Sequence, residues 1–327
     1  MNTGNPWDLK TQMLAAIKEK GGFVNCHAHF DKAYYITKDG LDHTMRLTME
    51  EKWRFSDDIK INSTQEQIEE RIRTALDMLV AQGCNYTVTF VDAYSAVGHK
   101  AIDAALKVRS EYESKIKVVI ATQPLDGLLT PEAQKLYEEI TAKADIAGGL
   151  PSKDRPRQAE NTDVMFSIAK NLNKPIHAHI DQLGRHDEFD TEILVNATAK
   201  HGYEGRVVAV HAVSPSAQPK KYRTELYKKM ADVGMSVACC PSAMLSQVMF
   251  EDSVSPMHNS IANVPEMLKA GINVGLGVDN VADFYCPFID GDMWVELRML
   301  MEACRYYDFD QLVNIATTNG RKLLDYA

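Results

Sequence analysis

The sequence has no uninterrupted apolar stretch of 18 or more residues, so it predicts no membrane-spanning helix. Residues 1–22 have no apolar segment of the kind found in secretory signals, and their pattern indicates an amphipathic helix. None of the six cysteines forms a C-x-x-C pair, which argues against a small disulfide-bonded scaffold. Together these absences predict a cytoplasmic protein with reduced, mostly buried thiols and no membrane partner.

Positive charge is also scarce, because 36 Lys and Arg face 45 Asp and Glu, for a formal net charge of −9. A nucleic-acid partner would require a basic surface, so we expect none. The sequence contains no low-complexity segment, charge block or linker rich in Pro, Gly and Ser that would mark a domain boundary. We therefore expect residues 1–327 to form a single domain with a helical extension over about residues 1–20.

Eight short apolar, β-branched segments alternate with longer amphipathic segments. The predicted strands cover residues 23–27, 86–92, 116–122, 145–151, 175–181, 206–212, 235–241 and 272–279. Several of the intervening segments end in glycine, as helices commonly do. Strand–helix alternation predicts an α/β fold with parallel strands, and eight units favour a (β/α)8 TIM-type barrel. A doubly wound open sheet is the alternative, since periodicity does not show whether a sheet closes.

Histidines and one aspartate lie at the ends of predicted strands. His27 and His29 are two residues apart, so on a strand their side chains project to the same side. His179, His211 and Asp279 end the fifth, sixth and eighth predicted strands. His211 follows His179 by 32 residues, about one strand–helix unit of a barrel. Because the carboxyl ends of barrel strands meet at one face, we expect these five side chains to lie close together.

Three or four imidazoles and a carboxylate are suitable ligands for one divalent metal ion such as Zn²⁺ or Fe²⁺. An ion with an open coordination position activates water as a nucleophile near neutral pH. A carboxylate on the same ion can accept the proton of that water and deliver it to a leaving nitrogen. The pattern therefore predicts a metal-dependent hydrolase with a small-molecule substrate. A metal-binding scaffold without catalysis is an alternative from another class of protein.

Several motifs are similar to those of the amidohydrolase superfamily, and most closely to its cytosine deaminase-like branch. They are HAHFDK (27–32), HAHID (177–181), the isolated His211 and GLGVDNVADFYCP (275–287). The likeness extends from about residue 20 to the end of the chain. It implies a (β/α)8 barrel with one metal ion bound by four residues: His27, His29, His179 and Asp279. Asp279 would also transfer protons, and His211 would hydrogen-bond the attacking water or the developing oxyanion.

The resemblance leaves some alternatives open. His177 shares a strand face with His179, so it is an alternative or additional ligand, or else a supporting residue. Two-metal relatives use a carboxylated lysine at the end of the fourth strand, where Lys153 is the only candidate. It follows Pro151 in an expected loop, which favours a mononuclear site. The adjacent Cys239–Cys240 pair is expected to pack rather than to act as a nucleophile.

Two departures from the family pattern concern the chemistry. Gln182 stands where the deaminase branch has a proton-transferring glutamate, and an amide forms hydrogen bonds but does not exchange protons. Leu125 stands where cytosine deaminases have a glutamine that pairs with the pyrimidine, which disfavours cytosine itself. We therefore favour hydrolysis of an amide, cyclic amide or N-substituted amine in a small polar or heterocyclic substrate. Deamination of an aminated heterocycle other than cytosine is the alternative.

Further substrate contacts are predicted next to these positions. Gln123 and Asp126 flank Leu125, and Asn280 and Asp283 follow the metal aspartate; Gln182 and Leu125 complete this predicted substrate-binding set. Lys32 is a substrate contact, a supporting residue or part of a loop ion pair. The usual family member also has a small β-sandwich built from both chain ends, and we expect most or all of it to be missing here. Apolar barrel flanks left exposed would favour a homo-oligomer.

Overall fold

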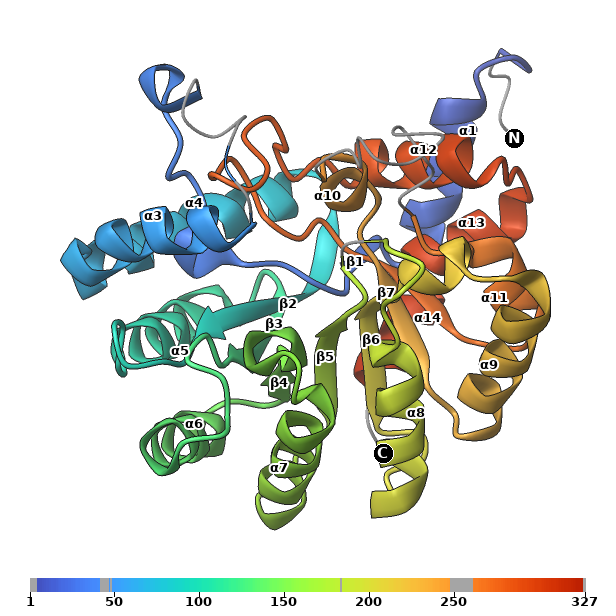
Figure 1. Ribbon diagram of the computed structural model, residues 1–327. Helices are drawn as coiled ribbons and strands as arrows, with labels where there is room; N and C mark the ends of the chain where they lie inside the picture. The colour runs from blue at the N-terminus through green and yellow to red at the C-terminus, as the bar shows by residue number, and fades with distance from the viewer. Residues whose placement is uncertain (1–4, 42–46, 48, 183, 248–260, 326–327) are drawn as a thin grey trace.

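A computed structural model describes residues 5–41, 47, 49–182, 184–247 and 261–325, without the side chains of residues 49, 50 and 53. In it, parallel strands alternate with helices that lie outside them (Figure 1). The strands are β1 (Phe23–Asn25), β2 (Cys84–Asp92), β3 (Lys117–Gln123), β4 (Ala147–Gly149), β5 (Ile176–Ile180), β6 (Val207–His211), β7 (Ser236–Cys239) and β8 (Val274–Leu276). All eight belong to two parallel sheets, ordered β1-β2-β3 and β4-β5-β6-β7-β8.

Backbone contacts join the two sheets at both junctions. Ala121 of β3 forms a parallel bridge with Ile146, which precedes β4. At the other junction, the N–H of Cys26 donates to the carbonyl of Leu276 at 2.8 Å. Ala28 and Asp279 form a second parallel bridge just beyond β1 and β8. The predicted α/β class with parallel strands is confirmed.

The amphipathic segments form helices that cover the strands. They are α1 (Leu9–Glu19), α3 (Met49–Asn62), α4 (Gln65–Ala81), α5 (Lys100–Tyr112), α6 (Pro131–Lys143), α7 (Gln158–Asn171), α8 (Asp190–His201), α9 (Lys220–Asp232), α10 (Pro241–Leu245), α11 (Val264–Lys269), α12 (Met293–Cys304), α13 (Phe309–Ala316) and α14 (Thr318–Leu324). A capping box starts α4, where Thr64 and Gln67 bond reciprocally. Within the described ranges, no helix is long and apolar enough to cross a membrane.

The strands are buried on both faces, as expected of parallel strands covered by helices. Along β6, Val208 and Val210 pack in an inner apolar cluster with Phe90 of β2. Val207 and Ala209 point the other way and pack in the cluster that includes the helices. In β5, Ile176, Ala178 and Ile180 also belong to the helix-facing cluster, so the alternating histidines of this strand face inward. The six cysteines are free, and five of them are buried.

Several predicted strands are shorter in the structure. β8 covers Val274–Leu276 instead of residues 272–279. After Leu276 the chain leaves its pairing with β7 and runs toward the residues that follow β1. The N–H groups of Val278 and Asp279 both donate to the carbonyl of His27, at 3.1 and 3.0 Å. β4 covers Ala147–Gly149 because a 3-10 helix, η3 (Pro151–Asp154), follows at once. These early strand ends free the following residues to line the carboxyl-end face.

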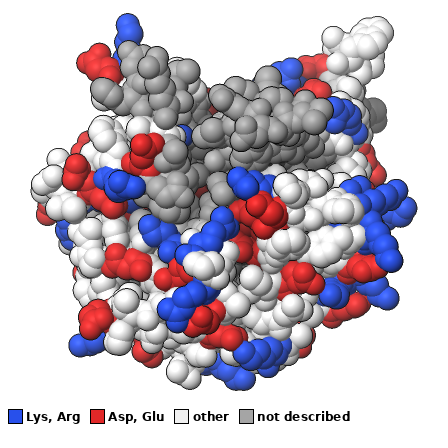
Figure 2. Space-filling model, in the orientation of Figure 1, with Lys and Arg blue, Asp and Glu red and all other residues white. Residues whose placement is uncertain are grey.

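The charged residues of the surface are mixed in sign. On the face drawn in Figure 2, blue and red side chains alternate over the described part of the molecule. Large apolar side chains are exposed at several positions, including Trp7, Leu9, Phe288 and Tyr307. The absence of nucleic-acid binding and the formation of a homo-oligomer stay predictions.

Candidate metal centre

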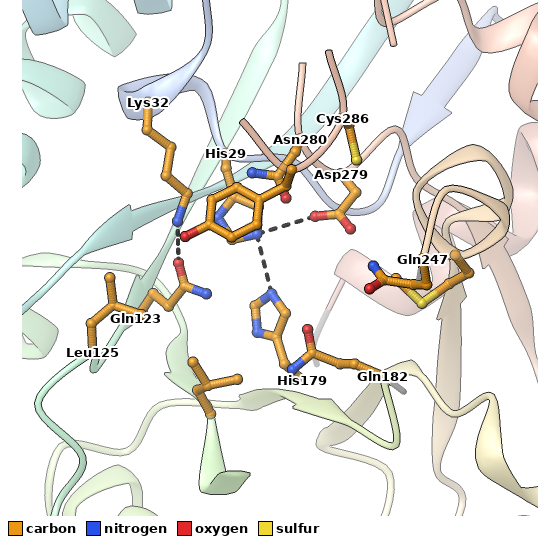
Figure 3. A pocket seen from close by; sticks show the side chains of 13 residues that line it. His29, Lys32, Gln123, Leu125, His179, Gln182, Gln247, Asp279, Asn280 and Cys286 are labelled. Atoms are coloured by element: carbon orange, nitrogen blue, oxygen red, sulfur yellow. Dashed lines mark hydrogen bonds and ion pairs between the residues drawn. The ribbon is translucent and has the colours of Figure 1, made fainter. Parts of the chain in front are cut away.

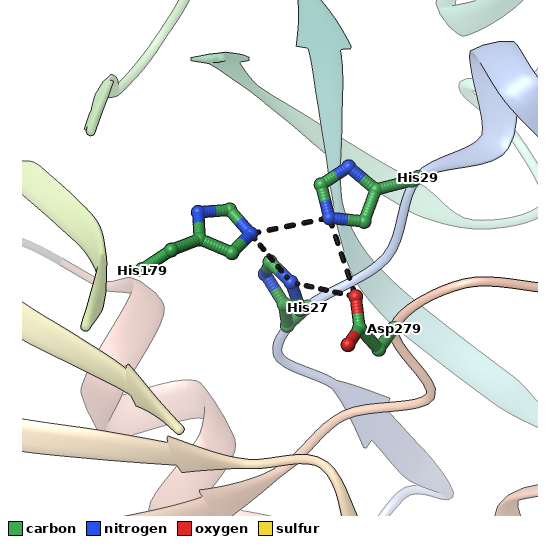
Figure 4. A group of neighbouring side chains, drawn as sticks. All are labelled: His27, His29, His179 and Asp279. Carbon is green, nitrogen blue, oxygen red and sulfur yellow. Dashed lines mark hydrogen bonds and ion pairs between the residues drawn. The ribbon is translucent and has the colours of Figure 1, made fainter. Parts of the chain in front are cut away.

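Three imidazoles and one carboxylate converge at the carboxyl end of β5 and just beyond the carboxyl ends of β1 and β8 (Figure 4). The Nε2 atom of His179 lies 3.1 Å from Nε2 of His27 and 3.2 Å from Nε2 of His29. Oδ1 of Asp279 lies 3.2 Å from Nε2 of each of these two histidines. All four side chains are buried. Residues 252 positions apart in the chain therefore present four donor atoms to one point.

The spacing of these donors suits a single divalent ion. Zinc–nitrogen and zinc–oxygen bonds of about 2.0–2.2 Å place neighbouring ligand atoms of a tetrahedral site about 3.3–3.6 Å apart, slightly less in five-coordinate geometry. Nδ1 of His179 lies 3.1 Å from the carbonyl oxygen of Gly149, so this nitrogen is the donor. Its Nε2 is then unprotonated and offers a lone pair to the cluster. The four residues are therefore a candidate site for one divalent ion.

The backbone around the cluster is tightly fitted. The side-chain amide oxygen of Asn25 accepts from the N–H of Val278 at 3.0 Å and so ties β1 to the end of β8. A Cβ atom added to Gly277 would lie 2.8 Å from Cβ of His27, so only glycine allows this approach. Asp279 has a φ of 64°, a conformation that aspartate and asparagine tolerate better than most residues. The position of the ligands therefore depends on local features of the chain, and on glycine at position 277 in particular.

Burial keeps His29 and His211 neutral. It lowers the pKa of His29 to about 3 and that of His211 to about 4. Neutral imidazoles can bind a metal ion without first losing a proton. Burial opposes ionisation of Asp279, but hydrogen bonds with His27 and His29 outweigh it and hold its pKa well below the ordinary value. The cluster is thus ready for a cation at neutral pH.

His211 lies on the far side of the aspartate. Its Nε2 atom is 3.8 Å from Oδ2 of Asp279, whereas Oδ1 faces the other histidines. The two carboxylate oxygens therefore have different neighbours. His211 has a φ of 75°, and backbone strain of this kind is concentrated at functional sites. The structure brings His211 to the cluster, as the sequence predicts.

His177 and Lys153 do not join the four donors. His177 is fully buried one step earlier on the same face of β5, and burial lowers its pKa to about 3. Lys153 is half-buried in η3, where its charged neighbours include Asp57, Lys60 and Asp126. Among the described residues, the predicted donors His27, His29, His179 and Asp279 form one group, and His211, Cys240 and Asp279 form a second, overlapping one.

A cavity opens beside the cluster, and Figure 3 shows the side chains that point into it. Its lining includes four of the predicted substrate contacts: Gln123, Leu125, Gln182 and Asn280. It also includes residues that the sequence analysis did not select: Leu150, Met244, Gln247, Tyr285 and Cys286. Tyr285 and Cys286 follow the metal aspartate within its motif, which was an available signal. Met244 and Gln247 follow β7 and had no comparable one.

The two other predicted substrate contacts, Asp126 and Asp283, lie outside the cavity lining. Asp126 is exposed, and its carboxylate accepts the N–H of Ser95 at 2.8 Å. Asp283 is buried beneath the loop that follows β8, where it accepts the N–H groups of Tyr285 at 2.8 Å and Cys286 at 3.0 Å. It also accepts a hydrogen bond from the side chain of Asn280. Its carboxylate therefore shapes the loop that lines the cavity.

Asp181 and Gln182, which follow His179 in the chain, point in different directions. Asp181 turns away from the cluster and accepts the N–H groups of Asp190 and Thr191, at 3.0 and 3.1 Å, at the start of α8. Gln182 points into the cavity next to His179 (Figure 3). The cavity side chain next to His179 is thus an amide, which forms hydrogen bonds but does not exchange protons.

The adjacent thiols are packed. Burial raises the pKa values of Cys239 and Cys240 well above their ordinary range, so both are protonated at neutral pH. A protonated thiol is a poor nucleophile.

Glu296 of α12 is a buried carboxyl group behind the cavity. It accepts the N–H of Ser242 at 3.0 Å, and burial raises its pKa to about 8. A carboxyl group with a raised pKa in the folded state stabilises the protein at low pH and loses that contribution as the pH rises. The ordinary value is 4.5, so the loss extends from about pH 4.5 to about pH 8.

We therefore expect Glu296→Gln to be as stable as the parent protein at pH 5 and more stable at pH 8. The amide keeps an oxygen for Ser242 but has no charge to bury, and the difference grows by up to ~1.4 kcal/mol per pH unit. Urea unfolding at several pH values would measure it. Glu302→Gln, on the exposed side of the same helix, is the matched control and should show no such trend. A parallel pH dependence in Glu296→Gln and the parent would contradict the expectation.

The comparisons with known proteins agree with this geometry. The model of the amidohydrolase family matches residues 21–326. An uncharacterized protein of Haemophilus influenzae is 35% identical over 265 residues, which cover 80% of this chain and 95% of that protein. The N-isopropylammelide isopropyl amidohydrolase of Pseudomonas sp. (strain ADP) is 29% identical over 312 residues, 93% of this chain and 74% of that protein.

A solved structure shows the same fold. The 5-methylcytosine deaminase of Klebsiella pneumoniae, liganded with phosphonocytosine, superposes with a TM-score of 0.86 at 22% identity. The superposition covers 92% of this chain and 74% of that one. The chain belongs to the amidohydrolase family, and it is a metal-dependent hydrolase that acts on C–N bonds other than peptide bonds.

Proposed function

We propose that this protein is a mononuclear hydrolase that cleaves a C–N bond of a small polar heterocycle by means of a metal-activated water. The observation on which the proposal rests is the convergence of three Nε2 atoms and one carboxylate oxygen within 3.1–3.2 Å of their neighbours. Three nitrogens and one oxygen suit Zn²⁺ or Fe²⁺ better than Mg²⁺ or Ca²⁺, which prefer oxygen ligands. We assign His27, His29, His179 and Asp279 as the ligands.

When bound, the ion supplies an activated water and polarises the bond that is attacked. Asp279 accepts the proton of the attacking water and donates it to the departing nitrogen. Oδ2, which faces His211, is free for this task because Oδ1 faces the other ligands. His211 donates a hydrogen bond to the oxygen that develops negative charge, an interaction that strengthens as the charge grows. The buried position of both residues excludes bulk water from this proton transfer.

The cavity lining supports a heterocyclic substrate. Gln123, Gln182, Gln247 and Asn280 offer four carboxamides, each with donors and an acceptor, while Leu125 and Leu150 provide apolar surface. The similar Pseudomonas protein is named as an isopropyl amidohydrolase of N-isopropylammelide. Because Gln182 has no exchangeable acid, we favour hydrolysis of an amide, cyclic amide or N-substituted amine over deamination.

Deamination of an aminated heterocycle other than cytosine is the second candidate. The observation in its favour is the ammonium group of Lys32 in the cavity, a hydrogen-bond donor for a ring nitrogen or oxygen. The four carboxamides of the cavity lining would also form hydrogen bonds with an aminated ring. The two candidates differ in the nitrogen compound that is released.

The architecture that we propose is a closed (β/α)8 TIM-type barrel, formed as one domain over residues 1–327. The contacts at both junctions between the two sheets support closure. The described residues place every named strand in these sheets, which is consistent with a barrel that lacks most or all of the accessory β-sandwich. A cytoplasmic location stays a prediction.

The proposal is tested by a screen of the protein loaded with Zn²⁺ or Fe²⁺. The panel contains cyclic amides, cyclic ureas and pyrimidines or triazines with alkylamino or amino groups. We expect release of an alkylamine, or opening of a cyclic amide, at least tenfold faster than release of ammonia from amino-substituted rings. Separate assays for amines, carboxylic acids and ammonia distinguish the outcomes. Faster ammonia release would favour the second candidate, and no turnover of any compound would contradict the proposal.

A further inference from the structure

One buried lysine points into the cavity beside the candidate metal ligands. This residue is Lys32, which follows His29 by three positions, and its side chain is 5% exposed. Its Nζ lies 3.0 Å from Oδ1 of Asp92 and 2.6 Å from Oε1 of Gln123. Figure 3 shows Lys32 and Gln123 reaching the space in front of His29. The described residues accept two of the three N–H donors of this ammonium, which leaves one for a ligand.

The charge of Lys32 is balanced by carboxylates that do not line the cavity. Asp92 also forms an ion pair with a second lysine, since Nζ of Lys60 lies 2.8 Å from Oδ2 of Asp92. Asp31 contributes a further carboxyl group and accepts the N–H of Asp92 at 2.9 Å. Burial lowers the pKa of Lys32, but Asp92, Asp31 and the more distant Asp283 outweigh it and raise the pKa overall. Lys32 is therefore a fixed cation at neutral pH.

The rest of the lining does not compensate this cation. Of the described residues that line the cavity, Asp279 is the one with a carboxylate, and its charge is shared with the metal ligands. A divalent ion leaves one unit of positive charge after Asp279 is counted. The other polar groups are neutral carboxamides, the phenol of Tyr285 and the thiol of Cys286. A ligand in this cavity thus meets the ammonium donor of Lys32 on one side and the candidate metal ligands on the other.

Gln123 is oriented by the same contact. Because its carbonyl oxygen accepts from Lys32, its amide N–H₂ group is turned away from the lysine. Two kinds of donor, an ammonium and an amide, then lie next to each other at the end of β3. Such a pair suits an oxygen with high negative charge, or an oxygen next to a deprotonated ring nitrogen. A hydrogen bond to a charged group contributes more than one between neutral groups.

We propose that Lys32 determines the specificity of this site by selecting an acidic, oxo-substituted ring in its anionic form, as in a deprotonated cyclic imide. This inference rests on the proposed function for the position of the substrate. Asp92 and Gln123 are positioning residues, since they hold the ammonium at the cavity wall. A neutral oxo-ring of the same shape would offer the ammonium a carbonyl oxygen that carries no full negative charge, and its hydrogen bond would be weaker.

The test measures binding without turnover. Titration calorimetry on the metal-loaded protein at pH 7 compares barbiturate, an anionic oxo-ring, with uracil, a neutral ring of similar size. We expect the parent protein to bind barbiturate at least 30-fold more tightly. Lys32→Met should reduce this ratio at least tenfold, with the metal content unchanged, because a charge-assisted hydrogen bond is lost. A ratio that is unchanged in Lys32→Met, or a parent protein that does not bind barbiturate, would overturn the proposal.

Two further variants guard against misfolding and against a general effect of charge. Gln123→Glu keeps Lys32 but pairs its ammonium with a carboxylate inside the cavity. It should also reduce the ratio of barbiturate to uracil affinity at least tenfold. Lys60→Met removes the same charge from the same Asp92 at a position that does not line the cavity. It should change the ratio less than threefold, and a loss as large as that of Lys32→Met would overturn a contact-based selection.

The calorimetric result is independent of the reaction. If compounds of the panel are hydrolysed but the ratio of barbiturate to uracil affinity is the same in Lys32→Met and the parent, the proposed specificity is wrong and the proposed function is unaffected. If this affinity ratio falls in Lys32→Met but no compound of the panel is hydrolysed, the proposed hydrolase function is wrong and the proposed selection of an anionic ring by Lys32 is unaffected.

Discussion

Asp279→Asn is expected to lower kcat/KM by about 10³-fold, the largest effect of any conservative substitution in this site. The amide is nearly the same size, and asparagine tolerates the positive φ of this position, so the fold should be retained. It keeps one oxygen toward His27 and His29 but cannot accept a proton. The loss should therefore appear mainly in kcat.

Kinetics with the substrate found in the panel screen, together with elemental analysis, would measure this effect. Asp103→Asn is the matched control, because Asp103 is a partly exposed residue of α5 that pairs with Lys143. It should retain the activity of the parent. If Asp279→Asn kept more than a tenth of the activity with a full complement of metal, Asp279 would not be the proton-transferring group.

His179→Ala is expected to lower metal affinity by more than 100-fold, so that the purified protein contains less than about a tenth of an equivalent. Loss of groups that merely hydrogen-bond a ligand already costs 10–100-fold, and removal of a ligand costs more. Elemental analysis after gel filtration would measure the content. His177→Ala is a demanding control, since this histidine lies on the same face of the same strand and is equally buried.

The control should retain one equivalent of metal, although a cavity in the core will lower its stability by a few kcal/mol. The opposite result, with metal lost from His177→Ala and kept in His179→Ala, would move the ligand one layer deeper. Loss from both variants with intact folding would indicate that both histidines bind.

The convergence of the ligands was predictable because it follows from topology. Residues at the carboxyl ends of parallel strands share one face, so strand ends alone bring His27, His179 and Asp279 together. The inner or outer orientation of a residue within a strand was also predictable, because alternation on β5 places His177 and His179 on one side. The alternation itself could not show how the chain continues once a strand has ended.

The loop residues were predicted less well for that reason. Asp126 was expected in the cavity, but after Gln123 the chain leaves β3, and the carboxylate of Asp126 binds the backbone of Ser95 instead. Asp283 supports the loop from below rather than lining the cavity. Gln247 enters the cavity from the segment after β7, far from every motif. Such placements depend on tertiary contacts that a single sequence does not encode locally.

An anomalous difference map from crystals of the metal-loaded protein, recorded at the absorption edge of the ion, tests the central claim most directly. The account predicts one peak, with Nε2 of His27, His29 and His179 and an oxygen of Asp279 all about 2.0–2.2 Å away. A peak bound by His177 in place of His179, a second peak beside Lys153, or no peak within reach of Asp279 would contradict it.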